Sequence, residues 1–142
     1  MSDDTEKTLD ETLLRHIARR LGTLSLVESV SVFPHERPES VVAWFDRQYF
    51  PDAIQQVALE IRAYTNGDFN ITYREDRGGT AWVCRWDRHE NPHNTRDHFH
   101  QPPKARTEDT VDRDYPADFV AVIDSVLERV DDRVGEVWND HE

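Results

Sequence analysis

The chain has 142 residues, the length of one ordinary domain, and a formal net charge of −12. Its single cysteine, Cys84, excludes an intramolecular disulfide and is typical of a protein from a reducing compartment. No run of about 20 apolar residues is available to cross a bilayer, and the acidic residues 1–10 do not match a secretory signal. We therefore expect one cytoplasmic domain over residues 1–142, with a disordered tail over 1–7 and no membrane contact.

The basic side chains are almost all arginine, because Lys7 and Lys104 are the two lysines among 17 basic residues, against 29 acidic ones. An acidic chain nearly free of lysine resembles halophilic archaeal proteins, although an acidic mesophilic protein or a nucleic-acid mimic would share this composition. At low salt, such a net charge would repel nucleic acid. In molar salt the Debye length falls to ~3 Å, so a local cluster of arginines would decide whether RNA or DNA binds.

The N-terminal part of the chain predicts one helix followed by two strands. Apolar residues recur every four positions over 8–21, which predicts an amphipathic helix that begins with a capping box at Thr8 and stops before Gly22. Residues 24–33 alternate between apolar and polar side chains, and residues 41–46 are almost continuously apolar. Both patterns predict strands.

Three more strands are predicted over residues 57–65, 69–73 and 80–87, because apolar side chains alternate in each range. Asn66-Gly67 lies between the first two ranges and is a strong hairpin signal. Residues 76–79 predict a second tight turn. The three strands are therefore expected to form an antiparallel meander.

The apolar pattern stops over residues 88–114, which predicts a long polar loop of the kind that is usually functional or disordered. Helical spacing of apolar residues then returns after Pro116 and continues to Trp138, which predicts a long amphipathic helix. The expected fold class is α+β, with an antiparallel meander of about five strands packed by an N-terminal helix and a long C-terminal helix.

Histidines gather at the start of the predicted loop, where four of the seven lie within twelve residues. These histidines and the charged side chains around them are Arg85, Asp87, Arg88, His89, His93, Arg96, Asp97, His98 and His100. Functional groups are often displayed where a strand runs into a loop. Any chemistry of this protein is therefore expected here.

Three interpretations of this segment remain open. In the first, His93, His98 and His100 exchange protons near neutral pH while arginine holds a phosphate, as RNA cleavage requires. In the second, His98 and His100 bind a divalent metal ion and either His93 or Asp87 completes the set of ligands, although the spacing matches no zinc motif. In the third, the histidines pack or form hydrogen bonds locally in a polar loop.

Arg62 and Arg74 are further candidates for binding a substrate. By strand alternation, both point away from the apolar faces of their strands. If these strands are neighbours, the two arginines line a patch that leads to the histidines. Salt pairing with Glu60 and Glu75 explains them equally well.

The order of these parts resembles the TumE-like toxin family. In that family a strand ends in Arg-Tyr/Trp-Asp, which is followed by Asn-Ala-Pro-His-His and, after a short gap, by His-x-His. Here Arg85-Trp86-Asp87, Pro92-His93 and His98-Phe99-His100 match these three motifs in order. The sequence departs from the family at residues 89–91, which lengthen the first gap, and at Asn94, which replaces the second histidine of the pair.

The resemblance covers residues 54–138 and implies a growth-inhibiting toxin held by a cognate antitoxin, usually a helix-turn-helix protein. We expect no cofactor, and a divalent metal ion is the alternative. The side chains themselves favour RNA as the target and a metal-independent endoribonuclease as the activity. The alternative is a non-enzymatic regulatory or metal-binding module that uses the histidine-rich loop.

The ribonuclease interpretation assigns a role to each candidate residue. Proton transfer falls to the three histidines, and Asp87 orients one of them or an arginine. The substrate-binding residues are Arg85, Arg96, Arg74 and Arg62. If a metal binds instead, the expected ligands are His93, His98 and His100.

Overall fold

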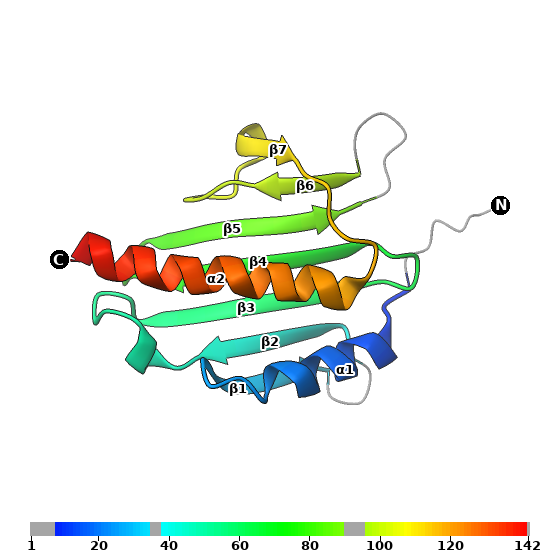
Figure 1. Cartoon of the computed structure of the whole chain (residues 1–142), viewed down its shortest axis with the longest axis horizontal. Helices are drawn as coiled ribbons and strands as arrows, with labels where there is room; N and C mark the ends of the chain where they lie inside the picture. Colours follow the sequence, from blue (N-terminus) through cyan, green and yellow to red (C-terminus); the bar gives the residue numbers. More distant parts are fainter. Residues whose placement is uncertain (1–7, 35–37, 90–95, 142) are drawn as a thin grey trace.

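The computed structural model describes residues 8–34, 38–89 and 96–141, so the predicted tail over residues 1–7 lies outside it. Within this part of the chain, seven strands form one antiparallel sheet whose spatial order follows the sequence (Figure 1). The strands are β1 (Val27–Phe33), β2 (Ser40–Phe45), β3 (Gln56–Ala63), β4 (Phe69–Asp76), β5 (Ala81–Arg88), β6 (Asp97–His100) and β7 (Thr110–Asp112). The helices are α1 (Glu11–Leu21) and α2 (Phe119–His141), with short 3-10 turns η1 (Arg47–Tyr49) and η2 (Thr107–Asp109). Neither α1 nor α2 is long and apolar enough to cross a membrane.

Both helices lie on the same face of the sheet, with α1 against β1–β3 and α2 across the middle of the sheet (Figure 1). The apolar side chains of each strand point toward this helix face, as shown by the buried Leu59, Ile71 and Trp86. Successive strand residues point to opposite faces, so the residues between these core positions lie on the other side. We call that side the open face, because no described helix covers it.

The helix α1 begins two residues later than the sequence predicts a cap. Asp10, not Thr8, is the N-cap residue, and its carboxylate accepts a hydrogen bond from the Leu13 backbone N–H at 3.1 Å. Leu9 instead forms an isolated antiparallel bridge with Tyr64 beside the sheet. The chain is thus held extended at the point where a capping box would need it to turn.

The meander of β3, β4 and β5 confirms the predicted strands and their order. The Asn66-Gly67 hairpin is present, with Gly67 at a φ of +94°, a left-handed conformation that glycine adopts readily. Paired registers run from Gln56 opposite Asp76 to Ala63 opposite Phe69.

The expectation of about five strands is wrong, because β6 and β7 lie inside the predicted polar loop and extend the sheet beyond β5. These strands have only four and three residues. Each contributes one apolar side chain, Phe99 or Val111, to the face of the sheet that the helices cover. A single apolar residue has no period, so the sequence pattern could not reveal either strand.

A buried ionic cluster joins α2 to the sheet. The Arg133 guanidinium donates two hydrogen bonds to the Glu75 carboxylate, at 2.8 and 2.9 Å, and lies 3.6 Å from the centre of the Trp82 ring. The Tyr73 hydroxyl donates a third bond to Glu75 at 2.7 Å. Burial on its own would raise the pKa of Glu75, but the hydrogen bonds from Arg133 and Tyr73 lower it overall. The carboxylate therefore stays ionised in the core and fixes the rotation of α2.

Replacing Arg133 with alanine would leave this carboxylate buried without its main partner. Because removing one partner of a buried ion pair costs about 3–5 kcal/mol, we expect Arg133→Ala to lower the free energy of unfolding by about that amount. Arg20→Ala is the control, since it removes an exposed ion pair with Asp124 and should cost at most about 1 kcal/mol. Urea titrations at one salt concentration measure both, and equal losses would contradict the role of the buried cluster.

Candidate functional site

The pairing of β5 with β6 brings four of the predicted site residues onto the open face. In this register Arg85 lies opposite His100, and Asp87 lies opposite His98. The intervening pair, Trp86 and Phe99, points to the helix face, with ring centroids 5.5 Å apart. All four polar side chains therefore share one side of two neighbouring strands.

Asp87 is the centre of this group. Its carboxylate accepts a hydrogen bond from Arg85 Nε at 3.1 Å and another from His100 Nε2 at 2.8 Å. Because a carboxylate only accepts, His100 carries a proton on Nε2 in this contact. Arg85 Nη2 lies 3.1 Å from the same ring nitrogen. The Thr110 hydroxyl is 2.9 Å from the other ring nitrogen, Nδ1, so His100 is held on both sides and is 8% exposed.

His98 is held less tightly than His100. Its Nε2 lies 3.8 Å from a carboxylate oxygen of Asp112, which is opposite it on β7, and its side chain is 18% exposed. No hydrogen bond to its ring is present among the described residues. Of the two imidazoles on β6, His98 is therefore the one whose nitrogens can meet a substrate.

A buried ion pair on the helix face fixes the strand that carries both histidines. The Arg88 guanidinium donates hydrogen bonds of 2.8 and 2.9 Å to the Asp97 carboxylate, and the two residues are 9% and 6% exposed. Arg88 also donates to the Tyr115 carbonyl at 2.9 Å, and the Tyr115 backbone N–H donates to Asp97 at 2.8 Å. The Tyr115 hydroxyl donates to the His98 carbonyl. Arg88 and Asp97 thus serve the structure and do not face the candidate site.

The pKa directions agree with this structural role. Hydrogen bonding to Asp97 raises the pKa of Arg88. Burial on its own would raise the pKa of the Asp97 carboxyl, but the hydrogen bonds from Arg88 and from the Tyr115 backbone lower it overall. Both groups are therefore charged in the folded protein.

The structure separates the remaining residues of the histidine-rich segment from the group on β5 and β6. His93, a predicted catalytic residue, lies outside the described residues. Arg96 is exposed, and its guanidinium lies 3.9 Å from the Asp68 carboxylate at the β3–β4 hairpin. That contact directs Arg96 away from His100, so its predicted phosphate-binding role has no support from this geometry.

Arg62 and Arg74 lie on the open face, as the sequence predicts, but each is paired along its own strand. Arg62 is 3.6 Å from Glu60, the predicted partner. Arg74 bonds to Asp76 at 2.8 Å, and the predicted pairing with Glu75 is wrong because Glu75 points to the opposite face. Such exposed pairs contribute only about 0–1 kcal/mol, so an incoming phosphate can displace the carboxylate.

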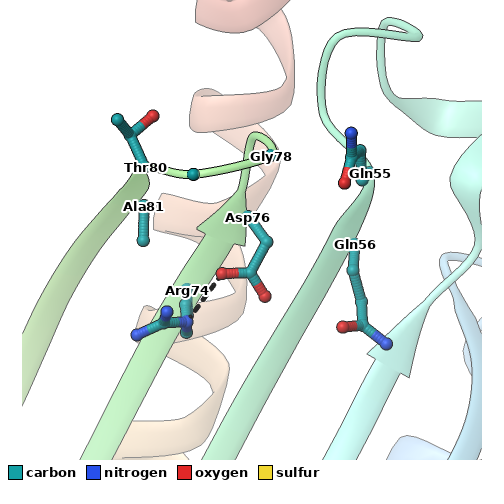
Figure 2. A pocket seen from close by; sticks show the side chains of 8 residues that line it. Gln55, Gln56, Arg74, Asp76, Gly78, Thr80 and Ala81 are labelled. Carbon is teal, nitrogen blue, oxygen red and sulfur yellow. Dashed lines mark hydrogen bonds and ion pairs between the residues drawn. The ribbon is translucent and has the colours of Figure 1, made fainter.

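A hollow of about 630 Å³ adjoins Arg74 on the open face, at the ends of β3, β4 and β5. Figure 2 shows the Arg74 and Asp76 side chains rising from β4 on the side of the sheet away from α2. The wall of the hollow also includes Gln55, Gln56 and the turn that contains Gly78. The hollow begins one strand row from Arg85, since Arg74 pairs with Val83 and the next pair on this face is Thr72 with Arg85.

The predicted metal ligands do not form a metal site in the described part of the chain. No group of three or more histidine, cysteine, aspartate or glutamate side chains is arranged there to hold a metal ion. His100 uses both ring nitrogens in hydrogen bonds to Asp87 and Thr110. With His93 outside the described residues, the metal interpretation remains a hypothesis.

Thr110, Asp112 and Tyr115 complete the surroundings of the histidines and were missed by sequence reasoning. They follow the histidines by ten or more residues, in a segment without apolar periodicity. Only the pairing of β7 with β6 brings Thr110 and Asp112 opposite the two imidazoles. No local sequence signal specifies that pairing.

The model of the family described as toxin TumE matches residues 14–134, which is most of the chain. The match begins inside α1 and so includes the N-terminal helix and first strands, beyond the region that carries the motif resemblance. No curated protein and no solved structure matches the chain.

The buried ion pair between Arg88 and Asp97 should make the stability of the protein depend on pH in the acid range. The pKa of Asp97 is lower in the folded protein than its ordinary value of 3.8, so the unfolded chain binds more protons. The stabilisation is therefore complete above pH 3.8 and is lost as the pH falls through the folded pKa. We expect Asp97→Asn to lower stability at pH 7 and to flatten the stability–pH curve below about pH 4, by up to ~1.4 kcal/mol per pH unit.

Asp112→Asn is the control for this titration, because the Asp112 side chain is 74% exposed. It should leave both the stability at pH 7 and the acid slope close to those of the wild type. Denaturant unfolding at a series of pH values and constant salt measures the slopes. An unchanged acid slope in Asp97→Asn would show that this carboxylate is not held ionised by Arg88.

Proposed function

Because the chain belongs to the TumE toxin family, we propose that it acts as the toxin of a toxin–antitoxin pair by attacking RNA. The observation that carries the RNA target is the convergence of Arg85, Asp87 and His100 within hydrogen-bond distance on the open face, with His98 beside them. A guanidinium that binds phosphate next to imidazoles that move protons is what cleavage of a phosphodiester requires. Toxin membership rests on the family; the reaction is our inference from the side chains.

In the proposed reaction, the 2′-hydroxyl of one nucleotide attacks the adjoining phosphate and the bond to the 5′-oxygen of the next nucleotide breaks. His98 is the accessible imidazole and is one of two proton-transfer groups. One of the two takes the proton of the attacking 2′-hydroxyl, and the other gives a proton to the leaving 5′-oxygen. Arg85, whose side chain is 34% exposed, binds the phosphate and stabilises its developing charge. The second proton-transfer group is His93 or, where the substrate displaces one of its two hydrogen-bond partners, His100.

Asp87 and Thr110 act as positioning residues in this proposal. Asp87 fixes the Nε2 proton of His100 and holds Arg85 beside it. Thr110 contacts Nδ1, where its hydroxyl donates to a neutral ring and accepts from a protonated one. His100 can therefore change its charge without losing either hydrogen-bond partner.

The charge of the chain shapes how RNA would approach. Three arginines of the open face each face a carboxylate of their own strand, namely Arg62 with Glu60, Arg74 with Asp76 and Arg85 with Asp87. The charges within each of these pairs cancel, whereas the whole chain has a net charge of −12. In high salt the long-range repulsion of RNA is screened within a few ångströms, so direct arginine–phosphate bonds decide binding. We accordingly propose that RNA binding works best in a salty cytoplasm.

An antitoxin partner follows from the toxin family. We propose a helix-turn-helix protein for this role, as in the family resemblance. A gene for a small helix-turn-helix protein beside the toxin gene would support this proposal.

Growth inhibition tests the assigned roles. We expect His98→Gln to relieve inhibition when it is expressed without an antitoxin, because losing an acid–base group costs roughly 10²–10⁴-fold in rate. Arg85→Ala should also relieve it, because this change removes the group that binds the phosphate. His16→Ala is the control, since His16 is exposed on α1 at the helix face and should leave the toxin fully active. Colony counts after induction and the melting temperature of each variant are the measurements.

The two readouts separate loss of chemistry from loss of fold. His98→Gln should keep a melting temperature near that of the wild type, because His98 makes one long contact to Asp112. Full toxicity of both His98→Gln and Arg85→Ala would refute the site. If the variants lose toxicity but total RNA stays intact in cells inhibited by the wild-type protein, RNA is not the target.

A further inference from the structure

The hollow beside Arg74 stands next to the candidate site on the same face of the sheet. Its lining is polar and comes from the ends of three strands: Gln55, Gln56, Arg74, Asp76, Gly78 and Ala81. Gln56 pairs with Asp76, and Asp76 pairs with Ala81, so these three side chains form one row across β3, β4 and β5. At about 630 Å³ the hollow lies within the range of small-molecule sites.

The hollow lies close to Arg85 along the open face. Along β4 and β5, the row that contains Arg74 and Val83 is followed by the row that contains Thr72 and Arg85. Two residues along a strand span ~7 Å, so Arg74 stands between the hollow and the phosphate-binding Arg85. A strand of RNA that follows β5 from a phosphate on Arg85 toward Ala81 would place its neighbouring nucleotide over Arg74 and the hollow.

The lining of the hollow carries hydrogen-bond donors and hydrogen-bond acceptors, the two kinds of group that recognise the edge of a base. The amides of Gln55 and Gln56 each offer a donor and an acceptor, and the Asp76 carboxylate offers acceptors only. In Figure 2, one carboxylate oxygen of Asp76 bonds to Arg74 and the other points away from it. Carboxylates in nucleic-acid sites accept from exocyclic amino groups, such as N4 of cytosine.

The turn of Gly78 and Gly79 keeps the hollow open at one end. Gly78 has a φ of +65°, and a Cβ there would lie 2.8 Å from Gln55 Nε2. A side chain at this position would therefore displace the Gln55 amide as well as strain the backbone. Glycine at position 78 therefore leaves room for the Gln55 amide.

We propose that this hollow binds one base of the RNA strand that Arg85 holds, and that Asp76 selects a base with an exocyclic amino group over uracil. The inference rests on the proposed RNA target and adds a specificity pocket to it. Cytosine presents an amino group where uracil presents a carbonyl oxygen. A carboxylate attracts the amino group of cytosine and repels the carbonyl oxygen of uracil. A comparison of these two bases therefore tests the Asp76 contact alone.

Binding of short labelled oligonucleotides tests the pocket with the wild-type protein. Oligocytidine and oligouridine with 2′-O-methyl groups are suitable probes, because the blocked hydroxyl prevents cleavage while the bases stay unchanged. We expect oligocytidine to bind about tenfold more tightly in fluorescence anisotropy at fixed high salt, within the range for one good base contact. Asp76→Asn should reduce this preference to less than about twofold, since an amide can serve either base.

Two further variants make the test specific. Ala81→Leu fills the hollow from a strand position without backbone strain, and should weaken oligocytidine binding by about tenfold. Asp124→Asn is the matched control, because Asp124 bonds an arginine at the same 2.8 Å distance as Asp76 but lies on α2, on the other side of the sheet. It should change neither affinity nor preference.

The possible failures are distinguishable. Equal binding of the two oligonucleotides, or a preference that survives in Asp76→Asn, would overturn the pocket and leave the RNA target standing. If neither oligonucleotide binds the wild type while growth inhibition persists, both the RNA target and the pocket are wrong.

Discussion

The ion pair between Arg88 and Asp97 is the contact on which the candidate site depends. The strand β6 has one apolar side chain facing the core, so hydrophobic burial alone specifies its register weakly. A slip of one residue would turn both histidines toward the helices and away from Asp87. Arg88 prevents this slip by donating two hydrogen bonds to Asp97 on the helix face, while the Tyr115 backbone bonds to both residues. Removing either partner would leave a charge in the core, which is costlier than the pair itself.

Charged residues therefore have different tasks on the two faces of the sheet. On the helix face, the buried pairs Arg88–Asp97 and Arg133–Glu75 hold β6 and α2 in place. On the open face, the arginines have carboxylate partners that are more exposed and more easily exchanged. A phosphate that replaced the exposed carboxylate of Glu60 or Asp76 would gain a bidentate guanidinium contact at little cost. Arginine serves both purposes better than lysine, and the chain has 15 arginines against two lysines.

Much of the architecture could be predicted from the sequence, because the long elements have clear periods. Both helices and the five strands from β1 to β5 follow from the spacing of apolar residues and from the Asn66-Gly67 turn. The short strands β6 and β7 could not be predicted, since each has a single apolar residue on the helix face and the register of β6 depends on the Arg88–Asp97 contact. Grouping Arg85, Asp87 and the histidines was possible because they are close in sequence. Recognising that Asp97 faces the core required the register of β6.

The most direct measurement of the central claim is which face of the sheet RNA contacts. Nuclear magnetic resonance of the isotope-labelled protein, titrated with a 2′-O-methyl oligonucleotide, would report this through the imidazole signals of His98 and His100 and the guanidinium signal of Arg85. We predict that these signals shift as RNA is added, while that of His16 on the helix face does not. Shifts confined to the helix face, with the open-face signals unmoved, would contradict our account of this protein.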